Sequence, residues 1–244
     1  MYDFWLEGKD NFAADRAAAE KVNTLVPDAP LQARAARQFL GRAVRFLAEA
    51  GIRQFIDLGT GLPTQWNVHQ VAQQVTPEAR VVYVDYDPVV LVHARAMLQD
   101  TEQVEVVQAD LRDPEKILQH PDTRALIDFD EPLGLILVGV LYFITDDEDP
   151  ASILARFRDA MTPGSYVAIS HTSTDNRPAG ERAKEIYNDA TAPHVPRTRA
   201  AIARLFDGFD LVEPGLVDVR VWGTDMVEQP KDTVVYAGVG RKPA

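Results

Sequence analysis

The sequence has 244 residues, 46% of them hydrophobic, no cysteine and a net charge of -12 at neutral pH. The lack of cysteine excludes disulfides, thiol nucleophiles and thiolate zinc sites, and the acidic charge disfavours a nucleic acid partner because phosphates repel it. No apolar run is long enough to span a membrane, and the first nine residues lack the layout of a signal peptide. We therefore expect a cytoplasmic globular protein that contacts neither nucleic acid nor membrane.

The first fifty residues are expected to form helices that dock on the rest of the chain. Four aromatic residues lie near the N-terminus: Tyr2, Phe4, Trp5 and Phe12. So many aromatic side chains are unusual for a free tail. Residues 31–50 follow, with apolar positions at helical spacing. We therefore assign residues 1–50 as a docking segment and residues 51–244 as the core, within one structural domain.

The most informative stretch is a glycine turn after a short strand. The strand ends on Asp57, and the chain turns through Gly59 and Gly61 into a helix expected to reach Gln74. Glycines allow positive φ angles and close approach of a ligand. A dinucleotide fingerprint needs a third glycine where this chain has Thr64. S-adenosylmethionine carries an amino group and a sulfonium, so an acid before the glycines favours that cofactor over NAD.

The next two predicted strands also end on carboxylates. Asp85 ends the strand of residues 80–85, 24 residues after Gly61, where an acid can bind both hydroxyls of a ribose. Asp110 follows the strand of residues 104–109, where a carboxylate can accept from the adenine amine. Acids of this kind also cap turns, but three successive strands that end this way indicate an adenosyl ligand.

The alternation of strands and helices continues through the second half of the chain. Residues 133–140 predict a buried central strand, and residues 166–170 predict a fifth strand with His171 at its end. Residues 172–207 are less regular and are the candidate substrate cap. Three further strands are expected at residues 209–213, 216–221 and 233–240, the last of them antiparallel. The fold class is therefore α/β, with one doubly wound, mostly parallel sheet.

Two acidic segments raise the question of a metal site. The run of residues 146–149 precedes Pro150, and acids at a helix start are favoured by the helix dipole. Asp175 and Asn176 are similar to the metal ligands of catechol-type methyltransferases, but the fourth strand lacks the acid that such a site needs. We expect helix capping at the first segment and no metal at either.

Several motifs together resemble a known family. The motifs cover residues 2–12, 54–64, 82–88, 170–171 and 236–242. The chain is similar over nearly its whole length to class I S-adenosylmethionine-dependent methyltransferases, and among them to the actinobacterial S-adenosyl methyltransferase group, which has no established acceptor. The resemblance implies a seven-stranded, Rossmann-like sheet. It also implies that Asp57, Gly59 and Gly61 lie near the methionyl part of the cofactor, Asp85 on the ribose and Asp110 near the adenine. The expected cofactor-binding set further includes Thr60, Tyr86, Leu111, Gly139 and Val140.

The chain departs from that group at three places. The group usually has two glycines where this chain has Glu7 and Gly8, and an Asn-Arg pair where this chain has Ala36 and Arg37. It usually has Leu-His-Phe where this chain has Leu141, Tyr142 and Phe143. The third departure places Tyr142 where substrate and methyl group are expected to meet.

The expected activity is methylation of a small-molecule acceptor at oxygen, nitrogen or carboxylate, with S-adenosyl-L-homocysteine as product. Because the sulfonium methyl is already activated, catalysis rests mainly on positioning an acceptor and excluding water. His171 is the candidate general base, although a histidine held in place by hydrogen bonds is an equal alternative, and Tyr142 is the candidate residue that orients the acceptor. Two other functions stay open: a module that binds the cofactor without transfer, and a nicotinamide-dependent oxidoreductase.

Overall fold

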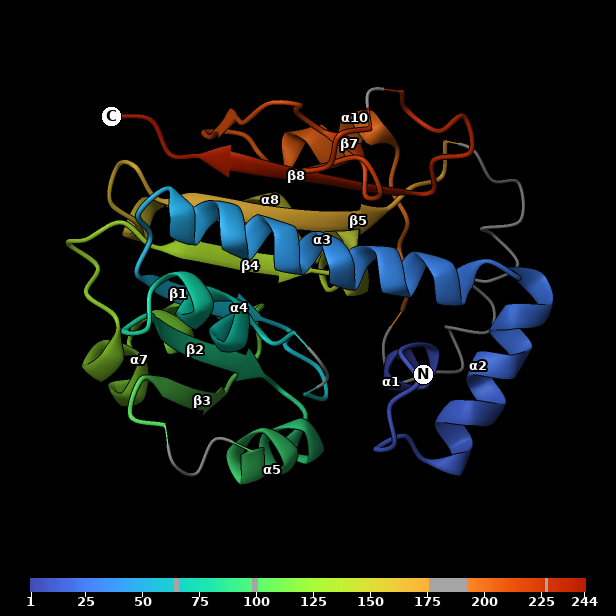
Figure 1. Cartoon of the computed structure of the whole chain (residues 1–244), viewed down its shortest axis with the longest axis horizontal. Helices are drawn as coiled ribbons and strands as arrows, with labels where there is room; N and C mark the ends of the chain where they lie inside the picture. Colours follow the sequence, from blue (N-terminus) through green and yellow to red (C-terminus); the bar gives the residue numbers. More distant parts are fainter. Residues whose placement is uncertain (64–65, 98–100, 176–192, 227) are drawn as a thin grey trace.

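The computed structural model describes residues 1–63, 66–97, 101–175, 193–226 and 228–244, and these residues build one large mixed sheet (Figure 1). Its strands are β1 (Gln54–Leu58), β2 (Arg80–Asp85), β3 (Val104–Gln108), β4 (Gly134–Val138), β5 (Tyr166–Thr172), β6 (Asp210–Leu211), β7 (Val217–Asp218) and β8 (Val235–Arg241). The order is β3-β2-β1-β4-β5-β8-β6, and β7 also pairs with β8. The strands β1 to β5 are parallel, while β8 runs antiparallel to its neighbours.

Parallel pairing brings the carboxyl ends of the central strands to one edge of the sheet. In Figure 1 the arrowheads of β2 and β4 point toward the side on which the N-terminal helices lie. The predicted cofactor residues follow these strand ends, so this edge is where a site is expected.

Helices cover both faces of the sheet. They are α1 (Tyr2–Trp5), α2 (Ala13–Leu25), α3 (Ala29–Glu49), α4 (Val68–Val75), α5 (Pro88–Met97), α6 (Pro114–Leu118), α7 (Pro121–Leu126), α8 (Pro150–Ala160) and α10 (Arg199–Arg204), with short 3-10 turns η1 (Leu141–Phe143) and η2 (Asp146–Glu148). One apolar cluster joins α3, α4 and α5 to the sheet, and the other joins α6, α8 and α10 to its opposite face.

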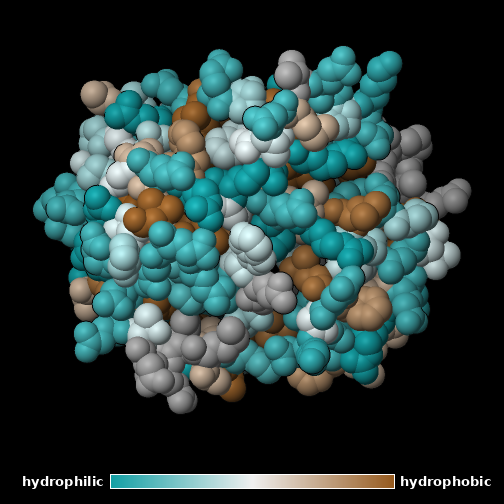
Figure 2. Space-filling model, viewed as in Figure 1, coloured by the Kyte–Doolittle hydropathy of each residue, from teal (hydrophilic) through white to brown (hydrophobic). Residues whose placement is uncertain are grey.

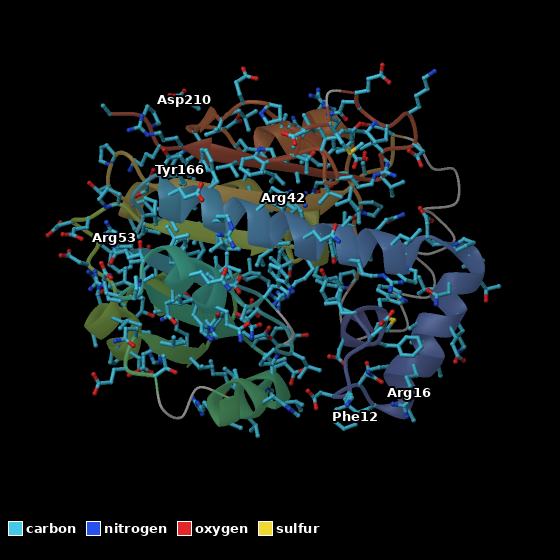
Figure 3. All side chains as sticks on the ribbon, in the orientation of Figure 1. Phe12, Arg16, Arg42, Arg53, Tyr166 and Asp210 are labelled. Atoms are coloured by element: carbon cyan, nitrogen blue, oxygen red, sulfur yellow. The ribbon has the colours of Figure 1, made fainter. Side chains whose placement is uncertain are left out.

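The helix α3 is the longest helix among the described residues, and it crosses the sheet. Its small and apolar residues pack against the core, and Phe39 lies edge-on to Trp222 with the ring centroids 5.5 Å apart. Arg42, labelled in Figure 3, donates from Nε to the Trp222 carbonyl at 2.7 Å and from Nη2 to the Val219 carbonyl at 2.7 Å. These contacts attach the helix to a turn almost 180 residues away in the chain.

The N-terminal segment docks on α3 through its first helix. Trp5 is 8% exposed, and its Nε1 donates to Asn23 at 2.9 Å. The Tyr2 hydroxyl donates to the Ala33 carbonyl at 3.0 Å. Phe12 is different, because it is 59% exposed and lies at the outer end of the segment (Figure 3). The aromatic residues of α1 therefore dock as expected, and Phe12 does not.

Three elements differ from the expectation. The two strands expected at residues 209–213 and 216–221 are shorter than expected, because β6 and β7 span two residues each, and both pair with β8. The helix after the glycine turn begins only at Val68, where Asn67 and Gln70 form a capping box. The strand β5 runs on to Thr172, so His171 lies inside the strand and not after it.

The acidic run before Pro150 caps a helix, as expected. Asp149 is the N-cap of α8, and its Oδ1 accepts from the Ser152 amide at 3.1 Å. The candidate cap of residues 172–207 is only partly described, because residues 176–192 lie outside the described residues.

The surface is mainly polar in the view of Figure 2, with separate hydrophobic areas between charged side chains. Within the described part of the chain, every helix falls short of the length and apolarity that a membrane crossing requires.

Two glycine substitutions test the packing of the N-terminal segment. A Cβ at Gly8 would lie 2.0 Å from Oδ1 of the buried Asp3, so Gly8→Ala is expected to lower the free energy of unfolding by about 1–3 kcal/mol, as overpacking does. The matched control is Gly41→Ala inside α3, where the nearest atom is 3.9 Å away. That change is expected to raise stability by about 0.5–1 kcal/mol. Urea unfolding of both variants measures the difference, and equal stability would contradict the docked arrangement.

Candidate active site

The glycine turn joins the ends of β1 and β2. The Gly59 amide donates to the Val84 carbonyl at 2.8 Å, and Thr60 Oγ1 donates to the Asp57 carbonyl at 3.1 Å. Gly59 has a φ of 70°, and a Cβ there would lie 2.3 Å from a methyl group of Val140. Glycine is therefore required at this position by backbone conformation and by close packing.

Asp85 meets this turn from the end of β2. Its Oδ2 accepts from the Gly61 amide at 2.9 Å, and its Oδ1 accepts from the Asp87 amide at 3.0 Å. A Cβ added to Gly61, which has a φ of 65°, would meet no atom of the described residues within 4 Å. Among the described residues the carboxylate and the turn thus border open space, with Tyr86 beside them and 54% exposed.

Asp57 is buried beneath the turn, at 4% exposure. Burial raises its pKa, the Arg37 guanidinium lowers it and Asp85 raises it, with a net value of about 7. Arg37 comes from α3, and its Nη2 donates to Asn67 at 2.8 Å. In the sequence, Arg37 stands out only as part of the Ala36-Arg37 departure from the family pattern. Its proximity to Asp57 could not be predicted, because twenty positions separate the two residues.

Asp110 also lies after β3, but its carboxylate already has a strong partner. Arg112 donates from Nε to both carboxylate oxygens, at 2.9 and 3.0 Å, and from Nη1 to Glu148 at 2.8 Å. The hydrogen bonds from Arg112 hold the pKa of Asp110 below its usual value. An adenine amine would therefore have to share this carboxylate with Arg112. The neighbouring residue Leu111 is buried. The sequence analysis did not identify Arg112 as a partner.

A cavity lies between the carboxyl ends of β4 and β5 and the N-terminal helices. Gly139, Tyr142, Ser170, Thr172 and His194 line one side of it. The apolar side is lined by residues of α1, α2 and α3, together with the start of β8. The Tyr142 ring lies 4.8 Å from the ring of His194, measured between centroids. Tyr142 therefore lines this cavity together with His194.

His171 is placed differently from the expectation. It is fully buried, and burial lowers its pKa to about 3. The distance from Nδ1 to the Thr172 carbonyl is 2.8 Å, and the distance from Nε2 to Arg197 Nη1 is 2.9 Å. Since arginine only donates, Nε2 accepts and Nδ1 carries the proton. Both ring nitrogens are occupied, and this geometry argues against the general-base role predicted for His171.

Arg197 is a buried residue that the sequence analysis missed. It donates to the carbonyls of Leu141 and Ile144, at 3.2 and 2.7 Å, and to the Asp146 carboxylate at 2.7 Å. These bonds hold the segment that carries Tyr142. Leu141, Ile144 and Asp146 lie more than 50 positions earlier in the chain, so no local motif points to this role.

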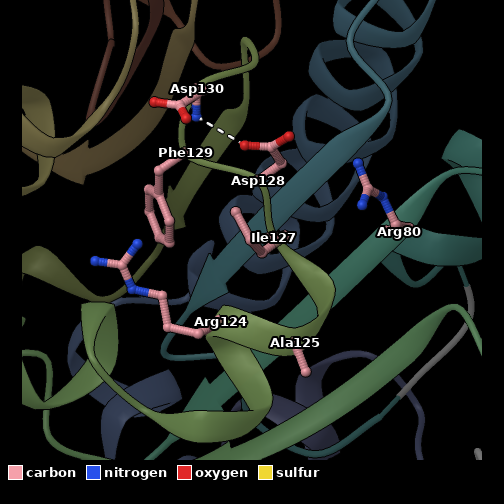
Figure 4. A pocket seen from close by; sticks show the side chains of 7 residues that line it. All are labelled: Arg80, Arg124, Ala125, Ile127, Asp128, Phe129 and Asp130. Carbon is pink, nitrogen blue, oxygen red and sulfur yellow. Dashed lines mark hydrogen bonds between the residues drawn. The ribbon is translucent and has the colours of Figure 1, made fainter.

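A second pocket lies at the opposite edge of the sheet (Figure 4). Its residues include Arg80, which begins β2, and Asp128 and Asp130, which precede β4. It is therefore distant from the carboxyl ends that carry the predicted site. The described residues contain no group of three His, Asp or Glu side chains that could hold a metal ion.

Comparisons with known proteins agree with this geometry. A family model described as S-adenosyl methyltransferase matches residues 1–243. A candidate methyltransferase from Thermobifida fusca YX is 44% identical, with a TM-score of 0.95 over 100% of this chain and 93% of that one. A DUF574 family protein from Streptomyces avermitilis MA-4680 is 38% identical, with a TM-score of 0.92 over 99% of this chain and 95% of that one. A search among curated proteins finds no match.

More distant structures share the fold. N-methyltransferase NodS from Bradyrhizobium japonicum WM9 is 14% identical, with a TM-score of 0.54 over 89% of this chain and 99% of that one. Human N-acetylserotonin methyltransferase, solved in complex with S-adenosylmethionine, is 15% identical, with a TM-score of 0.54 over 100% of this chain and 63% of that one.

The sheet order and the helical layers define the Rossmann-like fold that these more distant methyltransferases share. The family match is more specific: the chain belongs to the S-adenosyl methyltransferase family. It is therefore an S-adenosylmethionine-dependent methyltransferase, and the oxidoreductase alternative is not supported.

The burial of His171 predicts a loss of stability in acid. Its folded pKa of about 3 lies below the unfolded value of about 6.5. The unfolded chain therefore binds the proton first, so the stabilisation is complete above pH 6.5 and declines as pH falls toward 3. His171→Gln is expected to reduce the stability loss between pH 7 and 5 by about 1–2 kcal/mol. The surface variant His93→Gln is the control, and an unchanged pH profile in His171→Gln would contradict the buried neutral state.

Proposed function

We propose that this protein transfers the methyl group of S-adenosyl-L-methionine to a small-molecule acceptor held in the cavity beside Tyr142. The observation that carries this proposal is the adjacency of two features. Asp57, the glycine turn and Asp85 form an acidic edge for the cofactor. Gly139 lines the cavity together with Tyr142, and the next residue, Val140, packs against Gly59 of the glycine turn.

The residues at this edge fit the chemistry of the cofactor. Asp57 offers a negative charge to a cationic amino group, and Asp85 offers acceptors to ribose hydroxyls. The open space beside Gly61 admits close approach of a ligand to the backbone. Arg37 adds a cation suited to a carboxylate, which is a role that the sequence analysis had not assigned. Thr60, Tyr86, Asp110, Leu111, Gly139 and Val140 complete the proposed binding set.

The bound cofactor supplies an activated methyl group, and the chain has to position the acceptor and exclude water. Tyr142 is the proposed orienting residue because it lines the cavity. His171 has a positioning role in this proposal. Its Nε2 accepts from Arg197, which binds the backbone on both sides of Tyr142.

A turnover assay tests the activity against the alternative of binding without transfer. The wild-type protein is incubated with S-adenosylmethionine labelled in its methyl group and a panel of small metabolites. Binding of the cofactor is measured in parallel by calorimetry. Label transferred to a metabolite supports the proposal, whereas tight binding without transfer to any acceptor would favour the alternative.

Asp85 is expected to contribute strongly to cofactor affinity. Hydrogen bonds to a charged group are worth about 1.5–3 kcal/mol, so Asp85→Ala should weaken binding of S-adenosylmethionine roughly 10- to 150-fold. The control is Asp130→Ala, which removes a carboxylate at the opposite edge of the sheet (Figure 4). Calorimetry measures both variants. Unchanged affinity in Asp85→Ala would remove the ribose role.

Asp57 is expected to make cofactor affinity dependent on pH. Its pKa is about 7 in the free protein, and a cationic ligand favours the ionised carboxylate. Binding should therefore weaken as pH falls from 7 to 5.5, by up to about tenfold per unit. Asp57→Asn should bind more weakly at pH 7 and show a flat profile over that range. A wild-type affinity that does not change from pH 7 to 5.5 would contradict this assignment.

A further inference from the structure

The Ser170 hydroxyl is a buried polar group without a hydrogen-bond partner among the described residues. Ser170 is 1% exposed, lies near the end of β5, and lines the cavity that also contains Tyr142. Its neighbour across the sheet is Ala237 on β8. Leaving a buried hydroxyl unpaired costs about 1–3 kcal/mol, so packing alone would be served better by alanine at position 170. The hydroxyl therefore points to a ligand.

The described residues that line the cavity carry no formal charge at neutral pH. Apart from apolar and aromatic side chains, the lining consists of the neutral polar residues Gln32, Ser170, Thr172, Ser173 and His194. His194 is neutral because burial lowers its pKa to about 4. A carboxylate or ammonium ligand would lose its water shell here without gaining an opposite charge, which is costly.

Most of the remaining lining is apolar or aromatic. Trp5 and Tyr2 come from α1, Val22 comes from α2, and Ala33 comes from α3. Aromatic and aliphatic walls with few polar groups are typical of sites for planar apolar molecules. The N-terminal segment thus supplies much of the apolar surface, which gives its docking a purpose beyond packing.

We infer that the acceptor is a neutral aromatic molecule with a hydroxyl group that hydrogen-bonds Ser170 Oγ. This inference rests on the proposed function and deepens it. It selects neutral hydroxyl compounds over carboxylate and amine acceptors. Ser170 is a specificity-determining residue in this account, and the apolar walls bind the ring.

Four fragments of similar size test this class of ligand: phenol, toluene, benzoate and benzylamine. Each is titrated into the protein saturated with S-adenosyl-L-homocysteine, and binding is followed by NMR through the indole N–H signal of Trp5. The chain has three tryptophans, of which only Trp5 lines the cavity. Phenol should bind about 3- to 10-fold more tightly than toluene, as one neutral hydrogen bond provides. Benzoate and benzylamine should bind at least about tenfold more weakly than phenol, because each buries an unpaired charge.

Two variants remove the same kind of group from different places. Ser170→Ala should reduce phenol binding to the level of toluene and leave toluene unchanged. The matched control is Thr123→Val on α7, because Thr123 Oγ1 is also fully buried without a described partner but lies outside the cavity lining. It should leave all four fragments unchanged. Thermal unfolding of both variants shows that each is folded.

The outcomes separate this inference from the function on which it rests. Failure of S-adenosyl-L-homocysteine to bind would refute the proposed function. In that case the ranking of the four fragments on the ligand-free protein would still test the preference of the cavity for a neutral hydroxyl compound. If the cofactor product binds but charged fragments match phenol, or phenol is unaffected by Ser170→Ala, the inference is overturned while the proposed function stands. Shifts of the Trp66 or Trp222 signal without a Trp5 shift would also overturn it.

Discussion

The site depends on the hydrogen bond between the Gly61 amide and the Asp85 carboxylate, 2.9 Å long. It joins the ends of two strands that are consecutive in the chain and adjacent in the sheet. The parallel register that pairs Leu58 with Val84 brings these ends level. A slip of one residue would turn Asp85 to the other face of the sheet. Strand pairing therefore determines whether the acidic edge exists.

The second constraint is that charged groups near the cavity are paired outside it. Arg197 is buried, but it is bound to Asp146 and to backbone carbonyls. Burial lowers the pKa of His171, and the nearby Arg197 guanidinium lowers it further. Arg112 is bound to Asp110 and Glu148 in a similar way. Consequently the edge formed by Asp57 and Asp85 is acidic, while the described residues that line the neighbouring cavity carry no formal charge. This division of charge suits a cationic cofactor beside a neutral acceptor.

The N-terminal segment links fold and site. The aromatic residues of α1 dock on α3, and Tyr2 and Trp5 then form part of the cavity wall. The aromatic residues of the sequence indicate that this segment docks, but they do not indicate where it docks. The docking position depends on single contacts, such as the hydrogen bond from the Tyr2 hydroxyl to the Ala33 carbonyl.

The sequence predicted the fold well where its signals were periodic or came from residues at strand ends. The strands before Asp57 and Asp85 and the long helix α3 follow from such patterns. Predictions failed where capping or strand extension decided the outcome. The capping box of Asn67 and Gln70 starts α4 at Val68, several residues after the turn, and β5 continues past Ser170. Neither feature alters the hydrophobic pattern, which is why the pattern could not show them.

By itself, the sequence determined the α/β class, the order of elements and the three acids at strand ends, because each depends on local propensity or short spacing. Tertiary structure alone decided how those acids are used. It buried Asp57, paired Asp110 with Arg112, and enclosed His171 with Arg197. Burial and long-range pairing set the charge and the hydrogen bonds of a side chain, and both depend on residues far away in the chain.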